Sequence, residues 1–332
     1  MLHMNLGENS YDIHIGRGLI DQAGKLMNLN RRVLVVTDDG VPEDYARRVA
    51  AQCKSPVIVT LQQGEKSKSV DGWQRLLTAM LENSFTRGDC CVAVGGGMAG
   101  DLTGFAASAY MRGIDFYNIP TTTLSQVDSS IGGKTAINFG GIKNIVGAFW
   151  QPKAVIVDPD LPLTQDKRQY ASGLAEAVKM GMTSDKVLFE MFETADIAEN
   201  IEAIITRALQ IKKDVVEQDE KEQGLRKILN LGHTIGHGYE AQGIGLYHGE
   251  CVALGMIPMC EGNVRERLLR VLERLGLPTH CDVNANKVFD AMLHDKKFRN
   301  GKVTVITVPE IGSWQARDIT TEELRGILEA AQ

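Results

Sequence analysis

The first half of the sequence alternates short apolar segments with amphipathic segments, and this alternation constrains the fold more than any other feature. The amphipathic segment at 69–84 has the spacing of apolar residues that a helix requires. The apolar segments have the length and composition of buried strands and lie at 32–37, 55–60, 90–94, 115–120 and 153–158. Strands interleaved with helices predict an α/β domain in which a parallel sheet is covered on both faces.

The pattern changes after about residue 160. Only 303–308 and 314–317 look like strands, with a turn at Gly312 between them. The remaining long segments have helical periodicity and lie at 169–182, 184–195, 199–219, 226–241 and 248–275. A chain of 332 residues has the length of about two domains. We therefore expect an α/β domain at 1–160 and a mainly α-helical domain at 161–332.

The charge and the cysteines limit the classes of partner. The net charge is -6 without a long block of like charge, which argues against a general nucleic-acid-binding surface. The sequence shows neither an apolar run of the length that spans a membrane nor a secretory signal at its start. The six cysteines are scattered and form no CxxC pair, which is typical of free thiols in a reducing compartment. We expect a cytoplasmic protein without nucleic-acid or membrane partners.

A glycine-rich turn follows the predicted strand at 90–94. Three consecutive glycines begin at Gly95, and Gly100 and Asp101 follow in the start of a predicted helix. Glycines between a strand and a helix let backbone N–H groups approach a pyrophosphate, so the turn indicates a Rossmann-like, dinucleotide-binding domain. The spacing is not GxGxxG, and a tight turn with close helix packing is the alternative. The hydroxyls at 121–123 suit either helix capping or a ribose and nicotinamide.

Three of the seven histidines fall within sixteen residues. His233 and His237 are four residues apart on a predicted helix, His248 follows, and Glu176 lies on an earlier predicted helix. Two imidazoles and one carboxylate form a ligand set that zinc favours in catalytic sites, where one position stays open for water or substrate. The alternative is that the two neighbouring histidines share one face of a packed helix without a metal.

Taken together, the longer motifs resemble the 3-dehydroquinate synthase family of sugar phosphate cyclases over nearly the whole chain. The motifs that carry this resemblance are Gly95-Gly96-Gly97 with Gly100-Asp101, VDSSIGGKTA at 127–136, Lys143-Asn144, ASGLAE at 171–176, NLGHTIGH at 230–237, His248-Gly249-Glu250 and Asp295-Lys296-Lys297. The resemblance implies an N-terminal domain that binds NAD and a mainly helical C-terminal domain that binds a divalent metal. It implies zinc as that metal, with cobalt as an alternative, and a homodimer.

The resemblance also implies a reaction of the shikimate pathway, which leads to the aromatic amino acids. The substrate is the sugar acid phosphate 3-deoxy-D-arabino-heptulosonate 7-phosphate, and the products are 3-dehydroquinate and phosphate. The substrate is oxidised transiently by NAD, loses phosphate by elimination, is reduced again and closes its ring by an intramolecular aldol step. The enzyme is thus a carbon–oxygen lyase that eliminates phosphate.

The resemblance further implies roles for individual residues. The metal ligands are Glu176, His233 and His248, which leaves His237 for the phosphate pocket. The catalytic residues are Asp128, Lys134, Lys179, Lys212 and His237. The substrate-binding residues are Lys143, Asn144, Arg226, Asn230, Lys296 and, from the other subunit, Arg112. The NAD contacts are Asp38, Glu65, Lys68, Gly96, Gly97, Asp101, Thr121, Thr122 and Thr164. How the basic residues divide between the substrate's carboxylate and its phosphate stays open.

Three other functions share parts of this sequence pattern. A sister cyclase such as 2-deoxy-scyllo-inosose synthase would share the fold, NAD and metal, but Arg226 and Lys296 together favour a substrate that carries a carboxylate. A silent binding or scaffold protein would have a broken ligand set, and none is broken. A polyol dehydrogenase would not need the cluster of basic residues. The segments at 239–247 and 259–268 are short for the family, which affects local packing more than chemistry.

Overall fold

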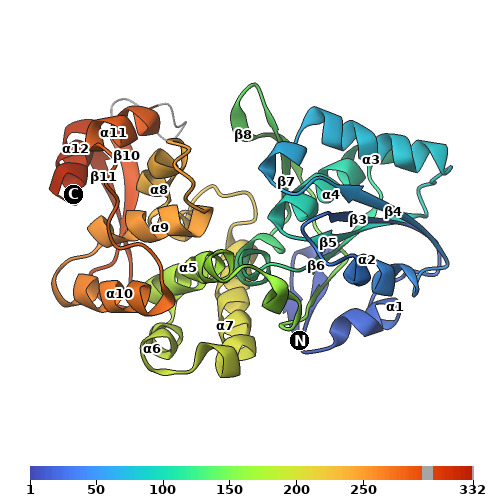
Figure 1. Ribbon diagram of the computed structural model, residues 1–332, viewed down its shortest axis with the longest axis horizontal. Helices are drawn as coiled ribbons and strands as arrows, with labels where there is room; N and C mark the ends of the chain where they lie inside the picture. Colours follow the sequence, from blue (N-terminus) through green and yellow to red (C-terminus); the bar gives the residue numbers. More distant parts are fainter. Residues whose placement is uncertain (294–301, 331–332) are drawn as a thin grey trace. The chain divides into compact units, whose positions relative to one another are not determined.

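The computed structural model describes residues 1–293 and 302–330 and divides the chain into two compact units, Met1–Gln165 and Asp166–Gln332 (Figure 1). The sequence pattern placed the boundary at residue 160. The boundary between the two units lies slightly later in the structure, because Gln165 is hydrogen-bonded to a residue of the first unit. Its side-chain oxygen accepts hydrogen bonds from Thr123 N at 2.8 Å and from Thr123 Oγ1 at 2.9 Å.

The first unit is built on a seven-stranded sheet. Its order across the sheet is β1 (Leu2–Met4), β2 (Tyr11–Ile15), β9 (Ala154–Val157), β6 (Asp115–Pro120), β5 (Cys90–Gly95), β3 (Arg32–Asp38) and β4 (Ser55–Leu61). All neighbours are parallel except β1 and β2, which are antiparallel. The predicted parallel sheet is therefore confirmed, and β1 and β2 extend it at one edge.

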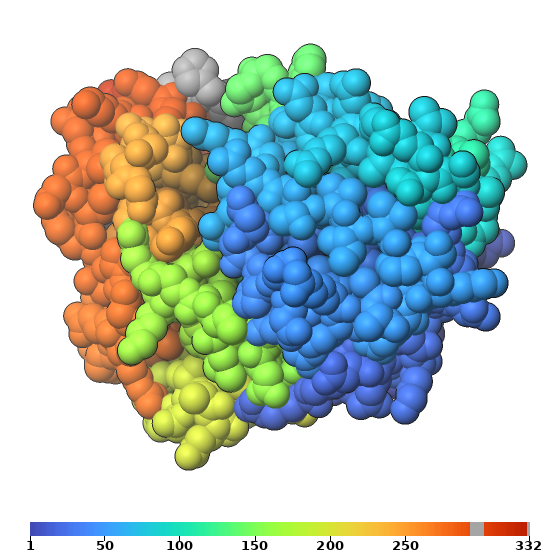
Figure 2. All heavy atoms as spheres, turned by 45° about the vertical axis from the view of Figure 1, so that its right-hand side comes forward, coloured from blue at the N-terminus to red at the C-terminus, as the bar shows by residue number. Residues whose placement is uncertain are grey.

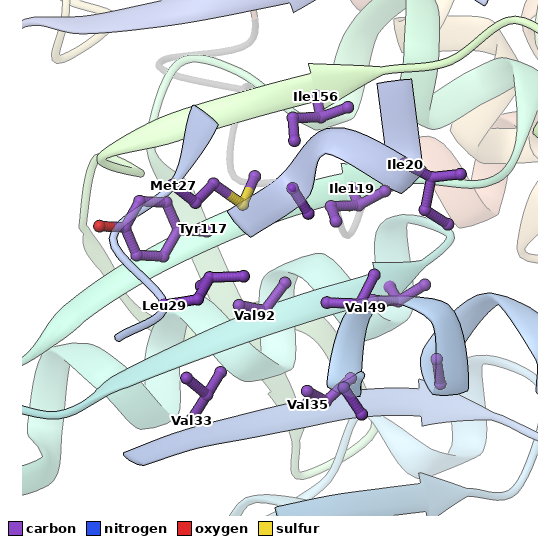
Figure 3. Close-up of a cluster of buried hydrophobic side chains, with 14 of the residues drawn as sticks. Ile20, Met27, Leu29, Val33, Val35, Val49, Val92, Tyr117, Ile119 and Ile156 are labelled. Atoms are coloured by element: carbon purple, nitrogen blue, oxygen red, sulfur yellow. The ribbon is translucent and has the colours of Figure 1, made fainter. Parts of the chain in front are cut away.

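Helices cover both faces of this sheet because the central strands carry buried apolar side chains on both of their faces. Val33 and Val35 of β3 lie in a cluster with Val49 of α2 (Glu43–Ala50), and Figure 3 shows them beside Val92 of β5. The alternate residues of β3 and β5 face the opposite cluster, which includes side chains of α3 (Val70–Glu82) and α4 (Gly97–Ala109). Successive strand residues point to opposite faces, so a continuous apolar strand needs cover on both.

An antiparallel hairpin of β7 (Lys134–Phe139) and β8 (Ile142–Phe149) follows a short π-helix at Ser125–Ser129. The sequence analysis did not predict this hairpin, because polar residues and glycines interrupt its alternation. Four large apolar side chains of the hairpin remain exposed, namely Phe139, Ile142, Val146 and Phe149. Exposed apolar side chains gathered on one element are typical of a protein–protein contact.

The second unit is mainly helical, as predicted. Its helices are α5 (Lys167–Ser184), α6 (Lys186–Thr194), α7 (Ile197–Gln218), α8 (His233–Glu240), α9 (His248–Met256), α10 (Gly262–Leu275), α11 (Ala285–Leu293) and α12 (Thr321–Ala330). One antiparallel hairpin, β10 (Lys302–Thr307) with β11 (Gln315–Thr320), accompanies them. In Figure 2 the light orange atoms of α8 and α9 gather in one region. No helix in the described ranges has the length and apolar character needed to reach across a lipid bilayer.

Two predicted helices are divided in the structure. The segment at 226–241 becomes a 3-10 helix, Leu225–Asn230, and then α8, because Gly232 adopts a left-handed conformation with φ of 76°. The segment at 248–275 is divided between α9 and α10 by a 3-10 turn, Ile257–Met259, that contains a proline, and by Cys260, which pairs with Val308. Because of these breaks, α8 and α10 each begin as a separate helix.

Candidate active site

Glu176, His233 and His248 come together in the second unit, each from a different helix. Glu176 lies in the middle of α5, and the histidines are the first residues of α8 and α9. His233 Nε2 lies 3.5 Å and His248 Nε2 3.4 Å from the same carboxylate oxygen, Glu176 Oε1. The three ligand atoms lie within 4.8 Å of one another. This is the geometry of a compact three-ligand centre.

The chemistry of this donor set fits a divalent metal. Glu176 is fully buried, and no described residue makes a hydrogen bond of standard geometry to its Oε1. A buried carboxylate oxygen without a hydrogen bond is costly unless a cation meets it. Two imidazole nitrogens and one carboxylate oxygen also match the three protein ligands that catalytic zinc uses. These residues would hold the metal and leave one coordination position for a substrate oxygen.

The surroundings set the charge of each group in the cluster. Burial alone would raise the pKa of Glu176, but Lys179, His233 and His248 outweigh burial and hold that pKa well below its usual range. Burial lowers the pKa of His233 well below its usual value, so its imidazole is neutral and can act as a ligand. For His248, burial is opposed by the carboxylates of Glu176 and Glu240, which raise its pKa to about 10. A metal ion therefore competes with a proton for His248.

Close contact between α5 and α9 holds the ligands in register. Gly249 N donates a hydrogen bond to Ser172 Oγ at 3.1 Å, and a Cβ on Gly249 would lie 1.8 Å from the carbonyl oxygen of Ser172. Only glycine permits this approach. Glu250, also in the first turn of α9, accepts hydrogen bonds from Arg168 Nε at 2.6 Å and Nη2 at 2.7 Å. Ser172 and Arg168 belong to the helix that carries Glu176.

The remaining predicted residues of the second unit lie around this centre or on neighbouring elements. His237 is one turn after His233 on α8, with ring centroids 5.5 Å apart. Lys179 and Lys212 are buried on α5 and α7, and Arg226 is buried in the 3-10 helix before α8, where its Nη1 donates to Glu220 O at 2.6 Å. Asn230 Nδ2 donates to Glu222 Oε1 at 3.1 Å. Lys296 lies outside the described residues.

In the first unit, the sheet topology marks a place for a nucleotide. The connection after β3 leads to β4 on one side, and β5 then pairs with β3 on the other side. Ligands of α/β sheets bind outside the carboxyl ends of the strands at such a switch point. Asp38 ends β3 and Gly95 ends β5, and a Cβ on Gly95 would lie only 3.5 Å from Asp38 Oδ2.

The start of α4 lies at the end of β5 and offers backbone donors. Gly96 is the N-cap and, having no side chain, does not itself cap the N–H groups of the first helical turn. A Cβ on Gly96 would lie 3.0 Å from Thr122 Cγ2, and one on Gly97 would lie 3.0 Å from Ser129 Oγ. Close packing therefore accounts for the glycines, and free N–H groups at a helix start also suit a pyrophosphate.

The other residues predicted to contact the cofactor fall into three groups. Asp38 and Thr164 line a cavity of about 600 Å³ next to β3, where burial raises the pKa of Asp38 above its ordinary value. Lys68 is buried and its ammonium contacts the Asp101 carboxylate, with Glu65 Oε1 3.9 Å away. The two threonines are partly engaged within the protein: the Oγ1 hydroxyl of Thr122 lies 2.7 Å from Ser125 Oγ, and the backbone N–H of Thr121 donates to Gly95 O.

The predicted substrate-binding residues of the first unit lie on its turns and hairpin. Asp128 is in the π-helix, Lys134 begins β7, and Lys143 and Asn144 lie on β8. Asn144 has a φ of 54°, and its N donates to Asn138 Oδ1 at 2.9 Å. Arg112 is exposed in the turn between α4 and β6, with a φ of 69°. These positive φ values show that the backbone is held in a conformation that non-glycine residues rarely adopt.

Sequence reasoning did not single out Glu240, the last residue of α8, whose Oε2 lies 3.5 Å from His248 Nδ1. The available signal was its helical spacing, three residues after His237 and seven after His233. A cavity of about 740 Å³ in the second unit, between α12 and the β10–β11 hairpin, is lined by none of the predicted site residues that the structure describes. Size alone therefore does not indicate the site.

Two family models match the chain. The model described as 3-dehydroquinate synthase N-terminal matches residues 58–172, and the model described as 3-dehydroquinate synthase C-terminal matches residues 173–298. The 3-dehydroquinate synthase of Alkaliphilus metalliredigens (strain QYMF) is 41% identical over 349 residues, which cover 98% of each chain. That of Caulobacter vibrioides (strain NA1000 / CB15N) is 40% identical over 358 residues, which cover 98% of this chain and 97% of the relative.

Solved structures share the fold over nearly the whole chain. A 2-deoxy-scyllo-inosose synthase complexed with carbaglucose-6-phosphate, NAD+ and Co2+ has a TM-score of 0.89 at 22% identity and covers 99% of both chains. ValA, a 2-epi-5-epi-valiolone synthase from Streptomyces hygroscopicus subsp. jinggangensis 5008 with NAD+ and Zn2+ bound, has a TM-score of 0.89 at 26% identity and covers 98% of both chains. The matched family segments adjoin at residue 172, and the relatives extend the similarity almost from end to end, so this chain belongs to the 3-dehydroquinate synthase family.

Proposed function

We propose that this chain is a 3-dehydroquinate synthase, a lyase that converts 3-deoxy-D-arabino-heptulosonate 7-phosphate to 3-dehydroquinate and phosphate. The observation that carries the proposal is the buried cluster of Glu176, His233 and His248 in a chain of this family. When bound, NAD accepts and returns a hydride, and zinc or cobalt polarises the hydroxyl that is oxidised. Solved relatives of the same fold contain NAD+ with Zn2+ or Co2+.

Residues of the second unit handle the metal and the substrate. Glu176, His233 and His248 hold the metal, and the ammonium of Lys179 contacts Glu176 Oε2 and keeps the carboxylate ionised. His237 assists the loss of phosphate. Lys212, Arg226, Asn230 and Lys296 bind the substrate, because a molecule with a carboxylate and a phosphate needs several fixed cations and donors.

Residues of the first unit bind NAD and complete the substrate contacts. The switch point at Asp38 and the glycine turn support a dinucleotide there, since they combine a carboxylate with free backbone N–H groups. We assign NAD contacts to Asp38, Glu65, Lys68, Gly96, Gly97, Asp101, Thr121, Thr122 and Thr164. Asp128, Lys134, Lys143 and Asn144 contact the substrate.

We further propose a homodimer in the cytoplasm. The exposed apolar side chains of the β7–β8 hairpin support a contact between two copies of the chain. Arg112 is exposed in a turn with a positive φ, which supports a role in reaching the partner's substrate phosphate. None of the six cysteines, which all lie in the described ranges, is in a disulfide, which fits a reducing compartment.

Supplying the heptulosonate phosphate with NAD and zinc tests the function. Phosphate and 3-dehydroquinate should appear together, and NADH absorbance should not build up, because the hydride is returned in each turnover. A hexose 6-phosphate, which lacks the carboxylate, is the control substrate and should react far more slowly. NADH that accumulates in proportion to the substrate consumed would contradict the lyase and indicate a polyol dehydrogenase.

A further inference from the structure

The imidazole ring of His248 lies between two carboxylates. Its Nε2 faces Glu176 Oε1 at 3.4 Å, and its Nδ1 faces Glu240 Oε2 at 3.5 Å. The side chains of His248 and Glu240 are 30% and 20% exposed, so water screens this pair only in part. The two ring nitrogens are therefore in different environments, one inside the three-ligand centre and the other outside it.

A histidine that binds a metal through one nitrogen carries its proton on the other. When that proton is held by a carboxylate, the tautomer and the ring orientation are fixed, and the ligand becomes more basic. The loss of such a support typically weakens metal binding by about 10–100-fold. Glu240 has the chemistry and the position for this role, since its oxygen faces the nitrogen that points away from Glu176.

We propose that Glu240 is a positioning residue that holds the Nδ1 proton of His248 and thereby directs Nε2 of His248 at the metal. The proposal rests on the metal centre assigned under the proposed function. α8 then supplies a ligand at its first residue, His233, and a support for another ligand at its last residue, Glu240.

The backbone at His248 is held in place without Glu240. Glu250 accepts a hydrogen bond from Tyr247 N at 2.8 Å and two from the guanidinium of Arg168. Gly249 N donates to Ser172 Oγ. Because these contacts fix the start of α9 against α5, removing the Glu240 carboxylate should change the orientation of the ring and leave the fold intact.

A second arrangement makes a different prediction. His237, Glu240 and His248 also offer ligand atoms within 4.8 Å of one another, so they could bind a cation of their own. In that case His248 Nδ1 would be a ligand and could not donate a proton to Glu240. The number of ions bound per chain distinguishes the two arrangements.

The test measures zinc affinity of the full-length protein by competition with a chelator. Glu240→Gln should weaken zinc binding by about tenfold and Glu240→Ala by about 10–100-fold, with one ion per chain in each case. The partial effect of Gln is expected because its side-chain oxygen remains an acceptor but loses the charge. Glu273→Gln, an exposed glutamate on α10, is the matched control and should bind zinc like the wild type.

A second readout does not depend on any variant. Long-range 15N NMR of the zinc-loaded wild type should show His248 protonated at Nδ1 with Nε2 bound to the metal. Wild-type affinity in both Glu240 variants, or a His248 metallated at Nδ1, would overturn the proposal. Two ions per chain, one of them lost in Glu240→Ala, would support the separate cation site instead. If the wild type binds no zinc, both this inference and the metal centre fail.

Discussion

Lys179 lies one helical turn after Glu176 on α5, and its ammonium contacts Glu176 Oε2 at a place where both side chains are fully buried. The pair gives the metal centre a fixed negative ligand next to a fixed positive group. Neither charge can be removed alone without leaving the other buried and unpaired, so the pair links metal binding to the stability of the second unit.

The first prediction follows from this link. Glu176→Gln should destabilise the protein by about 3–5 kcal/mol, because the ammonium of Lys179 would lose its buried carboxylate. Thermal unfolding of the metal-free protein measures this effect, and the variant should also bind zinc poorly. Glu190→Gln is the matched control: Glu190 pairs with Lys186 on the surface of α6 at 3.9 Å and should change stability by about 0.5 kcal/mol or less. Equal effects in the two variants would contradict the prediction.

The second prediction concerns the approach of α9 to α5. Gly249→Ala would place a methyl group 1.8 Å from the carbonyl oxygen of Ser172, so the helices must separate and His248 must move away from Glu176. We expect a loss of about 3 kcal/mol or more in unfolding free energy and a large loss of metal affinity. Gly326→Ala on α12 is the control, since no atom of the described residues lies within 4 Å of a Cβ built there and alanine favours a helix by up to about 1 kcal/mol. A stable, zinc-binding Gly249→Ala protein would show that this contact is not required.

The third prediction uses the raised pKa of Asp38. Burial disfavours the ionised carboxyl, so Asp38 takes up a proton at a higher pH in the folded chain than in the unfolded chain. Its contribution to stability is therefore full at low pH and is lost as the pH rises through the folded pKa. Asp38→Asn keeps an acceptor for Gly40 N and removes the charge, so the melting temperature should rise at neutral pH, with a gain that shrinks on acidification.

The same variant should bind NAD at least about tenfold more weakly, because a ribose hydroxyl would lose a charged acceptor. Calorimetric titration with NAD measures the affinity. A higher melting temperature together with weaker NAD binding in Asp38→Asn would show that Asp38 contributes to NAD binding and lowers the stability of the fold. Unchanged NAD affinity would remove Asp38 from the proposed cofactor contacts.

The sequence predicted those parts of the fold that local pattern controls. The strands β3, β4, β5, β6 and β9 are mainly apolar segments bounded by turns, and such segments can be found without information from the rest of the chain. β1 is only three residues long, β2 alternates apolar and polar residues over only five positions, and glycines lie in β8 and in the turn before it, so none of these segments is a long apolar run. The break at Cys260 depends on its pairing with Val308, which no local pattern reveals.

The candidate site shows the same division. The residue types and spacings indicated a metal centre, since two imidazoles and one carboxylate are a ligand set that zinc favours in catalytic sites. The meeting of Glu176 with His233, 57 residues later, depends on how α5 packs in the second unit, and sequence spacing cannot give it. Glu240 was missed for a related reason: its contact with His248 crosses from the end of α8 to the start of α9.

The last prediction concerns Arg112. Met111 and Arg112 both have positive φ values, 50° and 69°. Residues other than glycine rarely adopt this backbone conformation unless the surrounding structure or a function requires it. Arg112→Gly removes the side chain and relieves the strain at that residue, so the melting temperature should hold or rise while phosphate release is nearly lost. Arg112→Ala keeps the strain and should lose activity equally. An active Arg112→Gly enzyme would show that the guanidinium does not contact the substrate.

Mixing subunits tests whether Arg112 acts across a dimer. Arg112→Ala and His248→Ala are each expected to be inactive, for different reasons. If Arg112 serves the partner's site, a heterodimer of the two contains one site with intact metal ligands and an intact arginine. Random exchange should then restore about one quarter of wild-type activity, because half of the dimers are mixed and each has one complete site of two. If mass spectrometry confirms the exchange and no activity returns, Arg112 acts within its own chain or has no part in catalysis.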